Sequence, residues 1–134
     1  MIVIDASSLT KFILKEEHWE DVEPYLETGL NSLDYVFLES ASAIWRESVL
    51  RNRLSLEDAA KKLKSLESIQ ANVISSEAAV GYLKDGFEIA THEKIHIYDS
   101  LYIAQAKIKG TLLTSDKNQR NIALKLGIKA IFII

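Results

Sequence analysis

Short apolar runs recur along this chain, and longer segments with helically spaced apolar residues separate them. Val3 lies with Ile2 and Ile4 in a β-branched run, which is typical of a strand buried on both faces. Further runs of this kind follow at intervals that leave room for a helix between them. The pattern predicts five strands, at residues 2–4, 35–37, 72–74, 111–114 and 128–134.

Helical spacing dominates the segments between these strands. Leu38, Trp45 and Val49 fall on one face of a long helix, and we expect that face to pack against the core. Ser55 precedes Glu57 and Asp58 in a sequence typical of a capped helix start. The expected helices lie around residues 9–13, 19–26, 38–53, 55–70, 76–91, 99–110 and 116–127, with a linker at 92–98.

Strands that alternate with helices predict parallel βαβ units with right-handed crossovers. The chain has 134 residues, which matches the size of one domain with a substantial core. It contains no internal repeat and no flexible linker. We therefore expect residues 1–134 to form a single α/β domain with three layers, α/β/α.

The composition excludes some kinds of functional site for this chain. Hydrophobic residues make up 48% and charged residues 26%, as in ordinary soluble globular proteins. The net charge of −3 means that any affinity for nucleic acid must come from a local patch. The absence of cysteine excludes disulfides, thiolate zinc sites and cysteine nucleophiles. No secretory signal and no membrane-spanning run is evident, so we expect a cytoplasmic protein without membrane contacts.

Four carboxylates occupy positions that converge in such a fold. Asp5 and Asp116 follow predicted strands, whereas Glu39 and Asp99 stand at the start of predicted helices. Strand C-termini and the N-termini of adjoining helices share one rim of a parallel sheet. Ligands of open α/β sheets bind on that rim, where the strand order reverses. The topology therefore predicts that the four acids face one crevice.

Two interpretations of these acids are open from position alone. Asp is a common helix N-cap, and Asp99 and Asp116 would each be acceptable caps for the helices that they precede. Alternatively, carboxylates gathered in one pocket repel one another, and a hard divalent cation removes that conflict. Because the chain lacks cysteine and its histidines lie away from this rim, Mg²⁺ or Mn²⁺ fits better than zinc.

Four short motifs occur in order across nearly the whole chain. They are Val3-Ile4-Asp5-Ala6-Ser7 with Lys11 downstream, Leu38-Glu39 with Trp45-Arg46, residues 98–104, and Thr114-Ser115-Asp116. In order and spacing, they resemble the motifs of PIN-domain ribonucleases, and most closely those of the VapC-type toxins of prokaryotic toxin–antitoxin pairs. The individual motifs are short, so the specificity of the match lies in the complete set.

The resemblance implies an activity, a cofactor and a site. Asp5, Glu39, Asp99 and Asp116 would ligate Mg²⁺ or Mn²⁺, and the five parallel strands would run in the order 3-2-1-4-5. The hydroxyls of Ser7 and Thr114 would support the site. Asn118 stands where some members place another acid, so we expect one firmly held ion. The implied function is that of a metal-dependent endoribonuclease, in which a metal-activated water cleaves RNA phosphodiester bonds.

The resemblance also implies partners. It predicts a homodimer that is inhibited by a VapB-like antitoxin reaching the acidic pocket. Arg46 lies seven residues from Glu39, two helical turns, and therefore on the same helix face. We expect Arg46 to contact either an RNA phosphate or an antitoxin carboxylate, and Lys11 is a second candidate for that role.

Other functions remain open at this stage. One is a PIN-like module that binds RNA or serves in assembly with little catalysis, and another is a PIN nuclease that processes RNA outside a toxin–antitoxin pair. A signalling receiver domain shares the architecture, but it needs paired acids after its first strand and an Asp after its third. Here the first predicted strand offers only Asp5, and Ser75 and Ser76 follow the third.

Overall fold

A five-stranded sheet with β1 (Ile2–Ile4) at its centre organises the computed structural model, which describes all of residues 1–134. The other strands are β2 (Leu30–Leu33), β3 (Ile74–Glu77), β4 (Thr111–Thr114) and β5 (Lys129–Phe132). The strand order is β3-β2-β1-β4-β5, and every neighbouring pair is parallel. The predicted fold class and strand order are confirmed.

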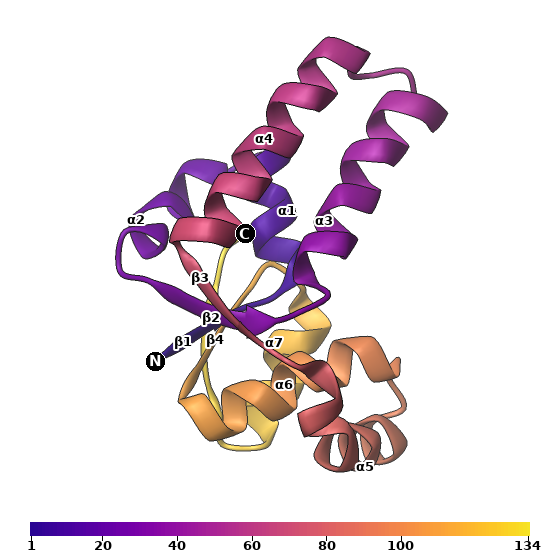
Figure 1. Cartoon of the computed structure of the whole chain (residues 1–134). Helices are drawn as coiled ribbons and strands as arrows, with labels where there is room; N and C mark the ends of the chain where they lie inside the picture. The colour runs from indigo at the N-terminus through magenta and orange to yellow at the C-terminus, as the bar shows by residue number, and fades with distance from the viewer.

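Helices cover both faces of this sheet, with α1, α3 and α4 on one side and α5, α6 and α7 on the other (Figure 1). No helix is long and apolar enough to cross a membrane. The helical elements are α1 (Ala6–Leu14), η1 (Trp19–Asp21), α2 (Glu23–Leu26), α3 (Val36–Trp45), η2 (Arg46–Leu50), α4 (Leu56–Asn72), η3 (Ala79–Tyr82), α5 (Leu83–Glu93), α6 (Ile97–Lys109) and α7 (Lys117–Lys125).

The second strand was predicted wrongly at residues 35–37, because β2 lies at Leu30–Leu33 and α3 begins at Val36. Two polar residues interrupt the apolar pattern of β2, so this strand is difficult to recognise in the sequence. Ser32 is completely buried, and its Oγ donates a hydrogen bond to the Ile4 carbonyl oxygen over 2.6 Å. A hydroxyl satisfied in this way is tolerated inside a sheet, although it breaks the apolar run that marks a buried strand.

The predicted core face of α3 was also wrong. Leu38, Trp45 and Val49 are 71%, 51% and 48% exposed. The face that packs on the protein is partly polar: Thr10 Oγ1 of α1 lies 3.1 Å from Ser40 Oγ, within hydrogen-bonding distance. Its buried residues are Val36, Phe37, Ser40, Ala43 and Ile44. The helix is therefore rotated so that Leu38, Trp45 and Val49 lie on the opposite, exposed side.

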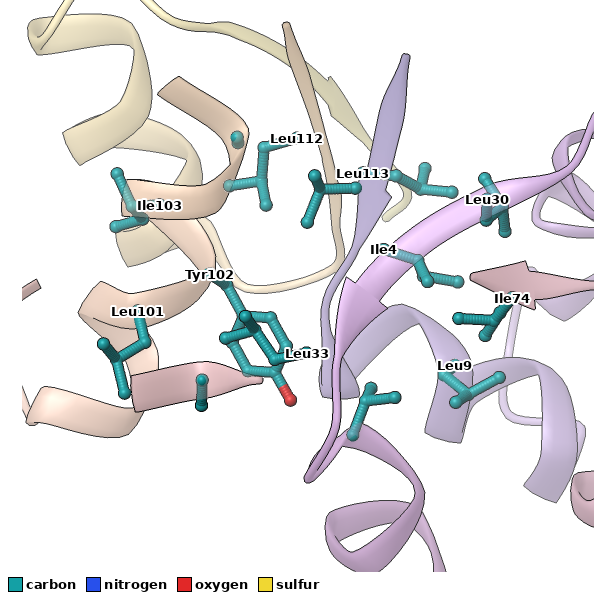
Figure 2. Close-up of a cluster of buried hydrophobic side chains, with 14 of the residues drawn as sticks. Ile4, Leu9, Leu30, Leu33, Ile74, Leu101, Tyr102, Ile103, Leu112 and Leu113 are labelled. Carbon is teal, nitrogen blue, oxygen red and sulfur yellow. The ribbon is translucent and has the colours of Figure 1, made fainter. Parts of the chain in front are cut away.

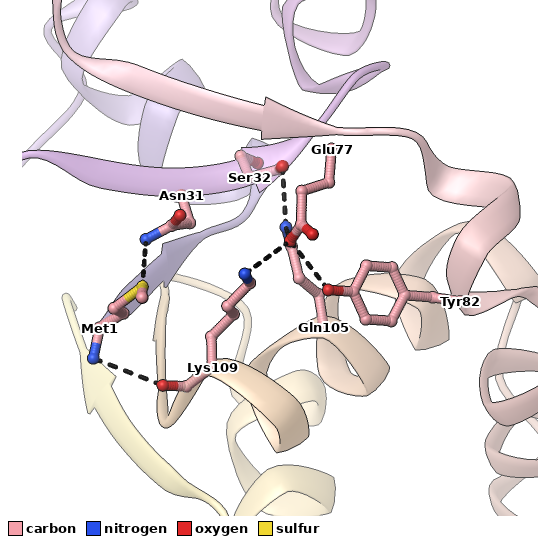
Figure 3. A network of polar contacts seen from close by, with 7 residues as sticks. All are labelled: Met1, Asn31, Ser32, Glu77, Tyr82, Gln105 and Lys109. Atoms are coloured by element: carbon pink, nitrogen blue, oxygen red, sulfur yellow. Dashed lines mark hydrogen bonds and ion pairs between the residues drawn. The ribbon is translucent and has the colours of Figure 1, made fainter.

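The third strand lies later than the predicted residues 72–74. Ser76 and Glu77, which were predicted to open a helix, belong to β3 at the sheet edge. Glu77 accepts hydrogen bonds from Tyr82 Oη at 2.8 Å and Gln105 Nε2 at 3.0 Å, and its carboxylate lies 3.3 Å from Lys109 Nζ (Figure 3). These partners, Gln105 foremost, lower the pKa of Glu77 below its usual range.

The predicted linker at 92–98 is shorter in the structure, because α5 ends at Glu93 and α6 begins at Ile97.

Buried apolar side chains from the central strands form the core against α1 and α6 (Figure 2). Ile4, Leu112 and Leu113 have no exposed surface. Tyr102 of α6 belongs to the same cluster, and its hydroxyl points away from the cluster's centre (Figure 2). Because packing fixes both β1 and β4, the residues that follow these strands are held in place.

Gly86 of α5 lies in close contact with Leu101 of α6. A Cβ at this position would lie 2.5 Å from Leu101 Cδ2 and 3.5 Å from Leu101 Cα. We expect Gly86→Val to lower the free energy of unfolding by about 2 kcal/mol or more, because the added atoms overpack this contact. Urea denaturation measures the change. Gly81→Val is the matched control, since no atom lies within 4 Å of a Cβ there. Equal stability of the two variants would contradict this account of the contact.

Candidate metal centre

The four acids reach one rim of the sheet from four different elements. Asp5 directly follows β1, and Asp116 follows β4, the strand that pairs with β1. Glu39 is in the first turn of α3, and Asp99 is in the first turn of α6. A pocket of about 370 Å³ is lined by Glu39, Asp99 and Asp116. Asp5 is completely buried next to it and contacts Ser7, which also lines the pocket.

Asp5 is held by three hydrogen bonds. Its carboxylate accepts them from Ser7 Oγ at 2.6 Å, from the Ser8 backbone N–H at 3.1 Å and from Thr114 Oγ1. Burial raises the pKa of Asp5 from 3.8 to about 6; these hydrogen bonds oppose the shift, and the nearby charge of Asp116 adds to it. A buried carboxylate with an elevated pKa favours any partner that compensates its charge.

The hydroxyls of Ser7 and Thr114 connect this acid to the loop that carries Asp116. Thr114 Oγ1 donates to Asp5 and accepts a hydrogen bond from the Asp116 backbone N–H at 3.0 Å. Ser7 Oγ donates to Asp5 and accepts from the Ser115 backbone N–H at 2.8 Å. The ends of β1 and β4 are therefore tied together directly beside the pocket.

Glu39 is oriented by a residue that the sequence reasoning missed. Tyr102 Oη donates a hydrogen bond of 2.9 Å to Glu39 Oε1. Burial raises the pKa of Glu39, the Tyr102 hydrogen bond lowers it, and the charge of Asp99 raises it further. Burial also holds the pKa of Tyr102 above its usual range, so this tyrosine remains a hydrogen-bond donor. Tyr102 lies within the third sequence motif, which was the available signal for it.

Asp99 and Asp116 both accept hydrogen bonds from Gln119, a second residue that the sequence did not point to. Gln119 Nε2 donates to Asp99 Oδ1 at 3.4 Å, and the Gln119 backbone N–H donates to Asp116 Oδ1 at 3.1 Å. Burial, followed by the charge of Asp116, raises the pKa of Asp99. Asn118 donates to Asp116 through its backbone N–H at 2.8 Å, but its side chain is exposed and does not line the pocket.

The capping interpretation of the acids is true for some of them. Asp116 caps α7, and Asp5 caps α1 by accepting from the Ser8 N–H. Asp99 is not a cap, because His96 occupies the N-cap position of α6. Glu39 lies inside α3, whose N-cap position is Tyr35. Helix capping therefore explains two of the four carboxylates and leaves Glu39 and Asp99 without a structural role of that kind.

Two basic residues line the same pocket. Arg46 is exposed and donates a hydrogen bond to Ser42 Oγ at 3.2 Å. Lys11 is buried, and its Nζ donates to the Glu17 carbonyl oxygen at 3.0 Å. Neither side chain forms an ion pair with the four acids. The pocket thus combines carboxylates with cationic groups that an anionic ligand would meet.

The donor set has the chemistry of a site for a hard cation. It consists of carboxylate oxygens, and burial together with mutual repulsion raises the pKa of several of them. No three Asp, Glu or His side chains are close enough to hold an ion by themselves, so the acids form an open set instead of a closed cage. Mg²⁺ is usually bound by one or two carboxylates, waters and substrate phosphates, which suits an open set.

Comparisons with known proteins relate this chain to one family. The model of the PIN domain family matches residues 2–125. Ribonuclease VapC3 of Pyrobaculum aerophilum is 34% identical over 120 residues, which cover 87% of this chain and 89% of that protein. The crystal structure of PAE2754, also from Pyrobaculum aerophilum, superposes with a TM-score of 0.68 at 20% identity, covering 90% of this chain and 83% of the other. At that identity, the structural match shows a shared fold alone.

Proposed function

Because this chain belongs to the PIN-domain family, and within it to the VapC-type ribonucleases, we propose that it is an endoribonuclease that depends on Mg²⁺ or Mn²⁺. The observation that carries the proposal is the convergence of acids from four separate elements on one pocket. A fold needs no such convergence for its stability, since buried and neighbouring carboxylates repel one another.

In this proposal, Asp5, Glu39, Asp99 and Asp116 would hold the ion together with water molecules, since no three of these side chains are close enough to hold it by themselves. When bound, the ion activates a water for attack on the phosphodiester and stabilises the charge that develops. Ser7 and Thr114 fix Asp5 through their hydroxyls. Tyr102 orients Glu39. Arg46 and Lys11, which line the pocket, bind an RNA backbone phosphate and so position the strand.

We further propose the biological setting that the VapC-type family suggests. The protein acts in the cytoplasm as a homodimer, and a VapB-like antitoxin inhibits it by placing a basic side chain in the acidic pocket. The acidity of the pocket supports this mode, since a cation is the natural partner of crowded carboxylates. Light scattering of the purified protein tests the dimer. Loss of RNA cleavage on adding the product of the adjacent upstream gene tests the antitoxin.

The test of the nuclease assignment uses purified protein that is free of antitoxin. We expect it to cleave RNA with Mg²⁺ or Mn²⁺, to leave 5′-phosphate ends, and to stop when a chelator removes the ion. Asp5→Asn is the control for a contaminating nuclease, since that variant should be inactive. If RNA is bound but not cleaved, the binding-module alternative is correct. Cleavage that continues in the chelator would contradict the metal dependence.

A further inference from the structure

Gln119 occupies a position of α7 where an apolar residue is expected. The buried residues of this helix are Gln119, Ile122 and Ala123, spaced by three and four so that they share one face. Gln119 is only 5% exposed, and it lines the acidic pocket. A polar side chain therefore interrupts the core face of α7 at the place where the face borders the candidate metal centre.

The contacts of Gln119 join two of the four acids. Its side-chain amide donates to Asp99 on α6, and its backbone N–H donates to Asp116 at the start of α7. Asp99 receives a hydrogen bond from no other group of the protein, whereas Asp5 receives three. The orientation of the Asp99 carboxylate therefore depends on Gln119, as that of Glu39 depends on Tyr102.

The amide of Gln119 is incompletely satisfied. Because Nε2 faces a carboxylate, the carbonyl side of the amide must point elsewhere, and Oε1 is buried without a hydrogen-bond partner. A buried acceptor left unpaired costs stability, and an apolar side chain of similar volume would avoid that cost. A buried polar side chain at the wall of a pocket, where it brings no gain in packing, is typical of a residue retained for function.

We propose that Gln119 is a positioning residue of the metal centre, which orients Asp99 toward the ion. The inference rests on the proposed function, since it requires that the acids bind a divalent cation. Residues that hydrogen-bond to metal ligands have large effects on metal affinity. Loss of one such residue typically weakens metal binding about ten- to a hundredfold. Gln119 would act through Asp99 and would not touch the ion.

Gln119→Met tests this proposal, because it keeps the length of the side chain and removes both amide functions. We expect Mn²⁺, added alone and followed by isothermal titration calorimetry, to bind the variant about ten- to a hundredfold more weakly than the wild type. The thermal midpoint of the metal-free variant should stay the same or rise, since an unpaired buried oxygen is gone. Gln119→Asn, whose amide is one methylene too short to reach Asp99, should show the same loss of affinity.

Gln105 provides a matched control elsewhere in the core. It is also a fully buried glutamine with an unpaired Oε1, and its Nε2 donates to Ser32 O and Glu77 Oε1 outside the pocket (Figure 3). Gln105→Met should lower stability and leave Mn²⁺ affinity at the wild-type value. The proposal is overturned if the Gln119 variants bind Mn²⁺ like the wild type, or if the variants at both positions lose affinity equally. A wild type that binds no Mn²⁺ would instead refute the metal centre of the proposed function, and this inference with it.

Discussion

Replacing Asp99 with asparagine is expected to slow RNA cleavage about a thousandfold or more while the fold stays intact. A neutral amide is a weaker oxygen ligand than a carboxylate, and it removes one negative charge from the pocket. A thousandfold loss corresponds to about 4 kcal/mol of transition-state stabilisation. The fold should tolerate the change, because Asp99 caps no helix and is only half-buried, and Gln119 alone donates to it. Initial rates with a fluorescent RNA substrate in excess Mn²⁺ measure the effect.

Asp85→Asn is the matched control for this experiment. Asp85 is also an acid in the first turn of a helix, α5, but it is exposed and lies outside the acidic pocket. Its substitution should leave the rate of RNA cleavage unchanged. It therefore controls for any general effect of losing an acidic side chain. An Asp99→Asn enzyme that retained a tenth or more of the wild-type rate would contradict the assignment of Asp99 as a metal ligand.

The metal-free protein should lose stability as the pH rises from 4 to 7.5, and Asp5→Asn should abolish part of that loss. The pKa of Asp5 is about 6 in the folded protein and 3.8 in its ordinary state. Between these values the folded state binds more protons than the unfolded state, so raising the pH favours unfolding. The contribution of Asp5 to stability is therefore present below pH 4 and is lost as the pH passes 6. A shift of this size is equivalent to about 3 kcal/mol.

Urea denaturation in the presence of a chelator, at pH 4 and at pH 7.5, measures this difference. The wild type should lose about 2–3 kcal/mol more than Asp5→Asn between the two pH values. Asparagine keeps the N-cap of α1, since it can accept from the Ser8 N–H as aspartate does. The same pH dependence in both proteins would show that Asp5 titrates at an ordinary value, and the argument from its burial would fail.

The fold could be predicted from the sequence where a strand carries an uninterrupted apolar run at its centre. The runs at β1 and β4 marked both central strands, and the motif order supplied the strand order. The strands that were misplaced, β2 and β3, contain serine, asparagine and glutamate. Their polar groups are satisfied by distant partners, as when Ser32 donates to the Ile4 carbonyl oxygen. No local pattern reveals a partner that lies far away in the chain.

The four acids could be placed on one rim because topology alone determines where strand and helix ends lie. The residues that hold those acids were harder to foresee. Tyr102 reaches Glu39 across 63 positions of sequence, and Gln119 reaches Asp99 across 20. Both contacts depend on how α6 and α7 are rotated against their neighbours. The rotation of α3 could not be predicted from its apolar spacing either. It is fixed by the packing of Ser40 against Thr10.

The central position of β1 has a consequence for how the protein is made. Asp5 and its donors Ser7 and Ser8 are synthesised well before β4, the strand that pairs with β1 and carries Thr114, the third donor to Asp5. Domains generally fold as units, and a nascent chain that stops before β4 and α7 carries acids without a pocket. The proposed activity would therefore arise only after β4 and α7 have been synthesised. Truncated products that end before β4 would then lack the proposed nuclease activity.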